Sequence, residues 1–270
     1  MKLRALDLFC GAGGATKGLQ LAGFHVTGVD QAAQPRYCGD AFIQADAITV
    51  PLDGYDFIWA SPPCQAFSRL RHLHPKTHPN LIPETREKLV GSGIAYCIEN
   101  VAEAPLGESG FLIVLCGTMF GLRTKNGRAE LRRHRLFETS FSIALRPRCQ
   151  HGYVPSLSVV GKGGHFTAPK VLTVTGHTPV DNQVRALQTI NVHGTGSPLG
   201  SNFSRRPRAV SITGSTAQTN VERNIVREVF TVEQAREAMG IDWMSMKGLS
   251  QAVPPAYSHF IAEQFLRSQP

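Results

Sequence analysis

The sequence lacks a hydrophobic run long enough to cross a membrane. No apolar stretch approaches the roughly 18 uninterrupted residues that a transmembrane helix requires. The first residues, MKLRALDLFCGAGG, do not have the layout of a signal peptide either. We therefore expect a cytoplasmic protein that makes no membrane contact. We also expect this protein to be a monomer.

Paired cysteine motifs are also missing. The six cysteines are widely scattered, and no two of them form a CxxC pair. In a chain expected inside the cell, this pattern favours reduced thiols over disulfides. Cys149 and His151 form the one metal-like pattern, but no second pair stands at ligand spacing. We interpret this pattern as a surface turn and expect no metal.

Acidic residues are scarce in the middle of the chain. Residues 123–230 hold 16 lysines and arginines but 5 aspartates and glutamates, a net charge of +11. Residues 1–122 carry a net charge of −2 and residues 231–270 a net charge of −1, so nearly all of the overall +8 lies in the central segment. Such a concentration is typical of a nucleic-acid-binding surface, although a solvated basic face has the same composition.

Strands and helices alternate in the first part of the chain, whose length and 42% hydrophobic content suffice for one large core and a small appended lobe. Buried-strand patterns and intervening helices, several of which end at glycine, predict an α/β fold with a mostly parallel sheet. In such sheets ligands bind at the carboxyl ends of the strands. The expected strands are 4–9, 25–30, 54–60, 95–100 and 111–116, with helices in 15–23 and 81–93.

The glycine-rich stretch FCGAGGATKG follows the first expected strand. It allows a ligand to approach the backbone beside a helix N-terminus, and Asp30, about 20 residues further on, is placed to bind a ribose diol. Asp46 can accept a hydrogen bond from an adenine amino group, although a lone loop aspartate is more often a helix cap. A dinucleotide fingerprint requires Gly or Ala at the position of Thr16, which disfavours a nicotinamide-dependent oxidoreductase.

Two further strand ends carry candidate catalytic groups. Pro62 and Pro63 stiffen the chain after residues 54–60, and they present Cys64 from a rigid extended arch whose carbonyl groups are free acceptors. A cysteine at such an exit suits a nucleophile better than a core residue. Glu99 ends the strand 95–100, where partial burial raises the pKa of a carboxyl group and lets it act as a general acid.

A pair of arginines completes the candidate site. The stretch LRRHRLF predicts a strand in which Arg133 and Arg135 share one face, while His134 points to the other. Two guanidinium groups side by side suit an anionic ligand or a thiolate.

These motifs together resemble those of the cytosine-C5 DNA methyltransferases. The stretches DLFCGAGG, SPPCQAFS, IENV, RRHRLFE, TVEQAREAMG and LSQAVPP stand in that family's order over residues 5 to about 150 and 227 to 265. Pro-Cys-Gln together with Glu-Asn-Val is highly specific, whereas the glycine loop is not. The resemblance implies a Rossmann-like, S-adenosylmethionine-binding domain with a small target-recognition insert.

The resemblance also implies roles for single residues. Cys64 is expected to attack C6 of a cytosine flipped out of duplex DNA, Glu99 to protonate N3, and Arg133 and Arg135 to steady the site. The residues expected to bind S-adenosylmethionine are Phe9, Gly11, Gly13, Asp30, Asp46 and Gln251.

The chain departs from the family pattern at two places. Leu131 stands where the family usually has glutamine, which removes one polar contact near the site. Ser250 and Gln251 stand where it usually has Gly-Asn, which can alter how the methionine end of the cofactor is held.

Residues 151–222 form the expected recognition insert, between a catalytic and cofactor-binding domain (1–150) and a C-terminal return to it (223–270). Short β-branched stretches, each followed by glycine, predict a small β-rich lobe, although a glycine-rich insertion without a recognition role would look similar. The residues expected to contact DNA are Gln65, Ser68, Arg69, Arg71, Arg185, Arg205, Arg206 and Arg208.

Three functions are compatible with these motifs. The favoured one is a DNA (cytosine-5-)-methyltransferase of the compact bacterial or phage type. A branch of the same family that methylates a transfer RNA is the second, and a catalytically silent DNA-binding relative is the third. The insert disfavours the RNA enzyme, and the intact Cys64, Glu99 and Arg135 disfavour the silent relative.

Overall fold

The computed structural model describes the two ends of the chain and short parts of its centre. The described residues are 2–65, 67, 79–127, 129–145, 147–151, 156–158, 164–166 and 228–269. Most of the expected insert therefore lies outside the described residues. So do most of the expected DNA contacts, namely Ser68, Arg69, Arg71, Arg185, Arg205, Arg206 and Arg208.

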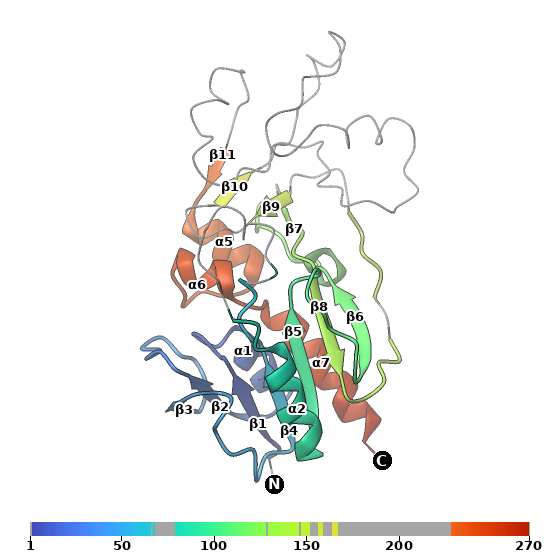
Figure 1. Ribbon diagram of the computed structural model, residues 1–270. Coiled ribbons are helices and arrows are strands. Elements are labelled where there is room, and N and C mark those ends of the chain that lie inside the picture. The colour runs from blue at the N-terminus through green and yellow to red at the C-terminus, as the bar shows by residue number, and fades with distance from the viewer. Residues whose placement is uncertain are drawn as a thin grey trace.

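The main sheet is mostly parallel, as the alternation of strands and helices predicted. Among the described residues, seven strands pair in the order β3-β2-β1-β4-β5-β8-β6 (Figure 1). The first five are parallel, and β8 runs antiparallel between β5 and β6. The strands are β1 (Arg4–Leu8), β2 (His25–Asp30), β3 (Ala41–Gln44), β4 (Phe57–Ala60), β5 (Ala95–Asn100), β6 (Phe111–Leu115) and β8 (Arg135–Thr139). The expected α/β class is confirmed.

Helices cover both faces of this sheet, and Figure 1 shows α2 and α7 on opposite sides of it. Alternate residues of a strand point to opposite faces. Phe57 and Trp59 accordingly pack with α1 (Gly14–Leu21) and α7 (Pro255–Ser268). Ile58 packs on the other face, with Leu89 of α2 (Ile82–Ser92). Both faces of the central strands are thus buried, as their continuous apolar patterns require.

A smaller sheet lies beyond the carboxyl edge of the main one, next to α5 and α6 (Figure 1). Its order is β11-β10-β9-β7, where β9 and β10 fall inside the expected insert. Leu131 of β7 packs with Ala235 and Met239 of α5 in a separate apolar cluster. The elements are β7 (Glu130–Leu131), β9 (Ser156–Ser158), β10 (Gly164–Phe166), β11 (Glu228–Phe230), α5 (Val232–Met239), α6 (Met246–Gln251) and the 3-10 helix η2 (Gly117–Phe120).

Two local expectations have different outcomes. The single strand expected over LRRHRLF is wrong, because residues 132–134 break it into β7 and β8, which belong to different sheets. The sequence also predicts a last helix from about Pro255, with Tyr257, Phe260, Ile261 and Phe265 on one face. This helix is confirmed as α7, and Tyr257, Ile261 and Phe265 are buried in the main core. Among the described residues, no helix has the length and apolarity to span a membrane.

The contact between α1 and α7 yields a stability prediction. A Cβ atom at Gly18 of α1 would overlap the Pro255 carbonyl oxygen and the Ser258 hydroxyl of α7, so the two helices must separate in Gly18→Ala. We expect this variant to lower the free energy of unfolding by at least about 2 kcal/mol. Gly91→Ala is the matched control, since Gly91 lies in α2 with no atom within 4 Å of the added carbon. It should raise stability by about 0.5–1 kcal/mol.

Urea unfolding followed by circular dichroism measures both differences. Equal effects of the two substitutions would contradict the close approach of α1 to α7.

Candidate active site

The strand ends of the main sheet bring the predicted catalytic residues to one edge. Ala60, the last residue of β4, pairs with Ile98 of β5. Cys64 follows four residues after Ala60, so it leaves the sheet at the edge where Glu99 follows Ile98. Because β8 is antiparallel to β5 and begins at Arg135, that arginine arrives at the same edge. Three separate segments thus meet here.

Glu99 is a buried carboxyl group held by an ion pair. Its side chain is 9% exposed, and its Oε1 lies 3.1 Å from Nε of Arg135. Burial raises the pKa of Glu99 above its ordinary value, and the charges of Arg135 and Arg133 oppose that rise. A hydrogen bond from Ser61 also opposes it. The pKa of this carboxyl group is therefore raised, as a general acid requires, and the two arginines limit that rise.

Cys64 is half-buried and electrostatically linked to the same groups. Burial has the largest effect and raises the pKa of its thiol, and the negative charge of Glu99 raises this pKa further. Arg135 and Arg133 act in the opposite direction. Removing the negative charge of Glu99 would therefore lower the pKa of the Cys64 thiol.

Arg133 lies deeper than Arg135 and is held by the C-terminal part of the chain. Its Nη2 donates to the carbonyl oxygen of Ser250 at 2.8 Å, and its own carbonyl accepts from the hydroxyl of Tyr257 at 2.6 Å. Burial and the neighbouring charge of Arg135 lower the pKa of Arg133. Its Nε has no partner among the described residues. The structure thus brings both predicted arginines to Cys64 and Glu99, although they do not lie on one strand.

The proline arch is fixed by residues for which the sequence assigned no role. Asn100 Nδ2 donates to the Pro62 carbonyl at 2.9 Å, so that carbonyl is not free, contrary to the expectation for the arch. Trp59 Nε1 donates to Ser61 Oγ at 2.9 Å, and Ser61 in turn hydrogen-bonds to Glu99. Trp59 is the residue before the end of β4, and Asn100 ends β5 within the Glu-Asn-Val motif, but neither position indicates the hydrogen bond that the side chain makes.

The glycine loop after β1 has the backbone of a ligand cradle. Phe9 adopts a positive φ of 59°, which is unusual for a residue other than glycine, and Gly11 and Gly13 have φ of 49° and 88°. No heavy atom lies within 4 Å of a Cβ built at Gly11, so the loop is open there. Asp30 fixes its shape by accepting from the Gly11 amide at 3.0 Å and from the Ala32 amide at 2.9 Å.

Each oxygen of Asp30 keeps a second lone pair, so the carboxylate can still bind a ribose diol. Asp46 caps its own turn, because its Oδ1 accepts from the Ile48 amide at 2.9 Å. This contact is the capping role that the sequence left open for Asp46, and its second oxygen makes no hydrogen bond to a described residue. These residues therefore fit the adenosyl part of the expected cofactor.

The C-terminal segment packs against the glycine loop. Trp243 Nε1 donates to the Ala12 carbonyl at 2.8 Å, and a Cβ at Gly14 would meet the Val253 carbonyl oxygen at 2.5 Å. Gln251, the last residue of α6, is exposed on this segment. The last motif thus lies against the first, over 200 residues away in the chain.

The two departures from the family pattern have different surroundings. Leu131 is buried in the apolar cluster with α5, so packing replaces the polar contact expected of a glutamine. Ser250 meets Arg133 through its backbone carbonyl, which any residue would provide.

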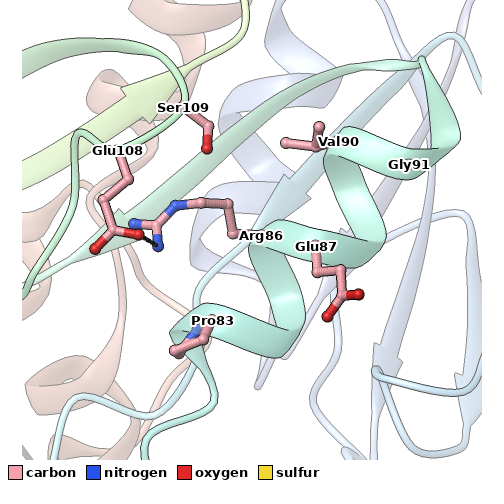
Figure 2. Close-up of a pocket in the computed structure, with 7 residues that line it drawn as sticks. All are labelled: Pro83, Arg86, Glu87, Val90, Gly91, Glu108 and Ser109. Atoms are coloured by element: carbon pink, nitrogen blue, oxygen red, sulfur yellow. Dashed lines mark hydrogen bonds and ion pairs between the residues drawn. The ribbon is translucent and has the colours of Figure 1, made fainter.

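A surface hollow on the outer side of α2 has no part in this site. It is lined by Pro83, Arg86, Glu87, Val90, Gly91, Glu108 and Ser109 (Figure 2). The guanidinium group of Arg86 is engaged by Glu108 at 3.0 Å and by the buried Glu138 at 3.0 Å. None of the residues that the motifs single out lines this hollow.

Comparisons with known proteins agree with the motifs. Residues 3–81 match the family described as C-5 cytosine-specific DNA methylase, which confirms the resemblance stated from the sequence. No curated protein sequence matches the chain.

Two solved structures share the fold over nearly the whole chain. One is a DNA modification methyltransferase encoded within an E. coli prophage, with 14% identity, a TM-score of 0.52, and coverage of 98% of this chain and 99% of that one. The other is the S. pombe Dnmt2 methyltransferase, with 14% identity, a TM-score of 0.50 and coverage of 99% of both chains. At this identity the likeness shows the fold, and it confirms the Rossmann-like methyltransferase architecture.

Asp7 beneath the glycine loop yields a prediction of pH dependence. It is buried in β1, and Thr16 donates to its Oδ2 at 2.5 Å, while its Oδ1 has no partner among the described residues. Burial raises the pKa of Asp7 to about 7 from an ordinary value of 3.8. Between these two values the folded protein binds a proton that the unfolded chain has released, so this group makes stability fall as the pH rises from about 4 to 7.

Asn cannot ionise, so Asp7→Asn escapes this loss. Its stability relative to the parent should increase by up to about 4 kcal/mol across that window and stay constant above it. Urea unfolding at pH 4.5 and pH 8 measures the difference, with the exposed Asp53→Asn as the control. A stability difference that does not vary with pH would show that Asp7 is already ionised in the folded protein.

Proposed function

Because residues 3–81 match the C-5 cytosine-specific DNA methylases, we propose that this protein is a DNA (cytosine-5-)-methyltransferase. It transfers a methyl group from S-adenosylmethionine to C5 of a cytosine in duplex DNA. The observation that carries the proposal is the pairing of Glu99 with Arg135 at 3.1 Å, beside the half-buried Cys64.

Cytosine C5 is a poor nucleophile, and the chain offers the groups that activate it. The Cys64 thiolate forms a bond to C6, the π electrons of C5–C6 shift to C4–C5, and the π electrons of C4–N3 move to N3, which takes a proton from Glu99. C5 then has enamine character. After methylation at C5, loss of the C5 proton to a base and departure of the Cys64 thiolate restore the C5–C6 double bond, and N3 returns its proton to Glu99.

The charges of the site couple these two steps. An ionised Glu99 raises the pKa of the Cys64 thiol and so favours the protonated sulfur. While Glu99 is protonated and hydrogen-bonded to N3, the two guanidinium groups of Arg133 and Arg135 act on the sulfur without an opposing carboxylate. The thiolate is then favoured. Cys64 is thus activated when a base with a ring nitrogen at Glu99 occupies the site.

Residues around the glycine loop would hold S-adenosylmethionine. Phe9 would stack on the adenine, Asp30 would bind the ribose, Asp46 the adenine amino group, and Gly11 and Gly13 would allow close approach of the backbone. Gln251 would lie toward the methionine end. When bound, this cofactor supplies an electrophilic methyl group on a sulfonium centre.

Duplex DNA is the proposed substrate because of the charge distribution. The net charge of +11 in residues 123–230 is the excess of positive charge that phosphate binding requires, and Gln65, directly after Cys64, is exposed. A cytosine must leave the base stack to reach a sulfur at the sheet edge. A cytoplasmic enzyme of a bacterium or a phage-infected cell, acting in DNA modification, is the setting that this proposal implies.

A methylation assay with two nucleic acids tests the proposal. Unmethylated duplex DNA of mixed sequence and bulk transfer RNA are each incubated with the purified protein and S-adenosylmethionine, and their nucleosides are analysed by mass spectrometry. We expect 5-methylcytosine in the DNA. Glu99→Gln should lower the rate by about 10²–10⁴ because the N3 proton is lost, and Cys64→Ser should abolish it, while both bind the cofactor as the parent does.

Methylation of the transfer RNA alone would support the RNA-methylating alternative. Absence of product from both nucleic acids, with the cofactor bound, would support the catalytically silent relative.

A further inference from the structure

Four side chains with metal-binding atoms converge at the strand break that carries the active-site arginines. Cys116 directly follows β6, His134 directly precedes β8, and Cys149 and His151 lie in the segment that leads toward β9. Their sulfur and ring-nitrogen atoms all lie within 4.8 Å of one another. Cys116 is buried, His134 is half-buried, and Cys149 and His151 are exposed.

Two of the distances between these ligand atoms match a tetrahedral zinc site, and a third distance must increase. Cys116 Sγ lies 3.5 Å from His151 Nε2, and Cys149 Sγ lies 3.5 Å from His134 Nε2. Zinc bonds of about 2.3 Å to sulfur and about 2.0–2.1 Å to nitrogen, at tetrahedral angles, separate the two ligand atoms by about 3.5 Å. The pair Cys149 Sγ and His151 Nε2, at 2.6 Å, must open by about 1 Å. Both residues of that pair are exposed, so they have room to move.

A hydroxyl group next to the cluster favours Cys116 Sγ as an acceptor. The hydroxyl of Thr118, in η2, lies 3.4 Å from Cys116 Sγ, to which it donates, and 3.4 Å from Cys149 Sγ. One hydroxyl between two sulfurs is an outer partner of the kind that steadies metal-bound thiolates. The rings of His134 and His151 stand edge to face, with centroids 5.1 Å apart, so their nitrogens can approach one point from different directions.

From this convergence we propose that Cys116, His134, Cys149 and His151 bind one zinc ion. Two thiolates and two imidazoles with no carboxylate form a ligand set that selects zinc over the hard cations magnesium and calcium. Four protein ligands complete a tetrahedral shell and leave no position for substrate or water. The site is therefore structural.

The position of the zinc gives it a defined role. His134 stands between Arg133 and Arg135, in the break between β7 and β8, where the backbone leaves one sheet for the other. A metal bond to His134 fixes this break and thereby both arginines. Through Cys149 and His151 it also ties the start of the expected recognition insert to the main sheet. Zinc is thus a positioning element for the active site and for the insert.

Metal analysis of the purified protein is the first test. After exhaustive dialysis, we expect elemental mass spectrometry to find one zinc ion per chain. Cys149→Ser and His151→Ala, both at exposed positions, should lose most of it. Cys38→Ser and His25→Ala are the matched controls outside the cluster and should keep it. Zinc absent from the parent, or retained by both cluster variants, would overturn the proposal.

Cobalt substitution keeps the test independent of how the variants fold. Parent protein is stripped of metal with a chelator, shown by circular dichroism to remain folded, and titrated with Co²⁺. We expect intense visible bands of tetrahedral cobalt together with thiolate charge-transfer absorption, saturating at one equivalent and displaced by zinc. Weak octahedral bands alone would overturn the proposal. A disulfide between Cys116 and Cys149 in protein kept under reducing conditions would also overturn it.

Discussion

The ion pair between Glu99 and Arg135 ties two neighbouring strands together at the edge where the candidate catalytic groups meet. A carboxylate that is 9% exposed can remain ionised only if a cation replaces the water it has lost. Arg135 can do so because β8 enters the sheet antiparallel, directly beside β5, and begins at this edge. The position of β8 in the sheet is therefore a requirement of the site's electrostatics as well as of the fold.

The same constraint explains why the end of the chain returns to its beginning. Arg133 would be a second buried cation without support, but the carbonyl of Ser250 accepts from its guanidinium group and the hydroxyl of Tyr257 fixes its backbone. The segment that carries these two residues also holds the glycine loop, through Trp243 and through the contact of α7 with α1. One C-terminal segment thus contacts both the glycine loop and Arg133.

Local sequence pattern predicted β1, β2, β4, β5 and β6, the helices α1 and α2, and the residues at the ends of these strands. Continuous apolar runs identified the strands, and the strand-end rule placed Asp30, Cys64 and Glu99 at one edge, where the structure finds them. Contacts between distant segments could not be predicted in this way. No spacing signals that residues 132–134 would break a strand between two sheets, or that Asn100 would occupy the Pro62 carbonyl.

The cysteine and histidine cluster shows this limit most clearly. Its four members are separated by 17, 14 and 1 intervening residues, which matches no short ligand pattern. Only the order of β6 and β8 in the sheet brings Cys116 to His134. The sequence therefore suggested a surface turn at Cys149 and His151, because no local pattern connects these two residues with Cys116 and His134.

The most direct measurement of the proposed chemistry is covalent trapping. Fluorine at C5 cannot leave as a cation, so an enzyme that adds its sulfur at C6 remains bonded to the base after methyl transfer. Parent protein, incubated with S-adenosylmethionine and a random-sequence duplex pool containing 5-fluorocytosine, should form a complex that survives denaturing electrophoresis. Peptide mass spectrometry should place the bond at Cys64, and Cys64→Ser should form none. An adduct formed by Cys64→Ser, or no adduct from parent protein that binds both DNA and cofactor, would contradict the account.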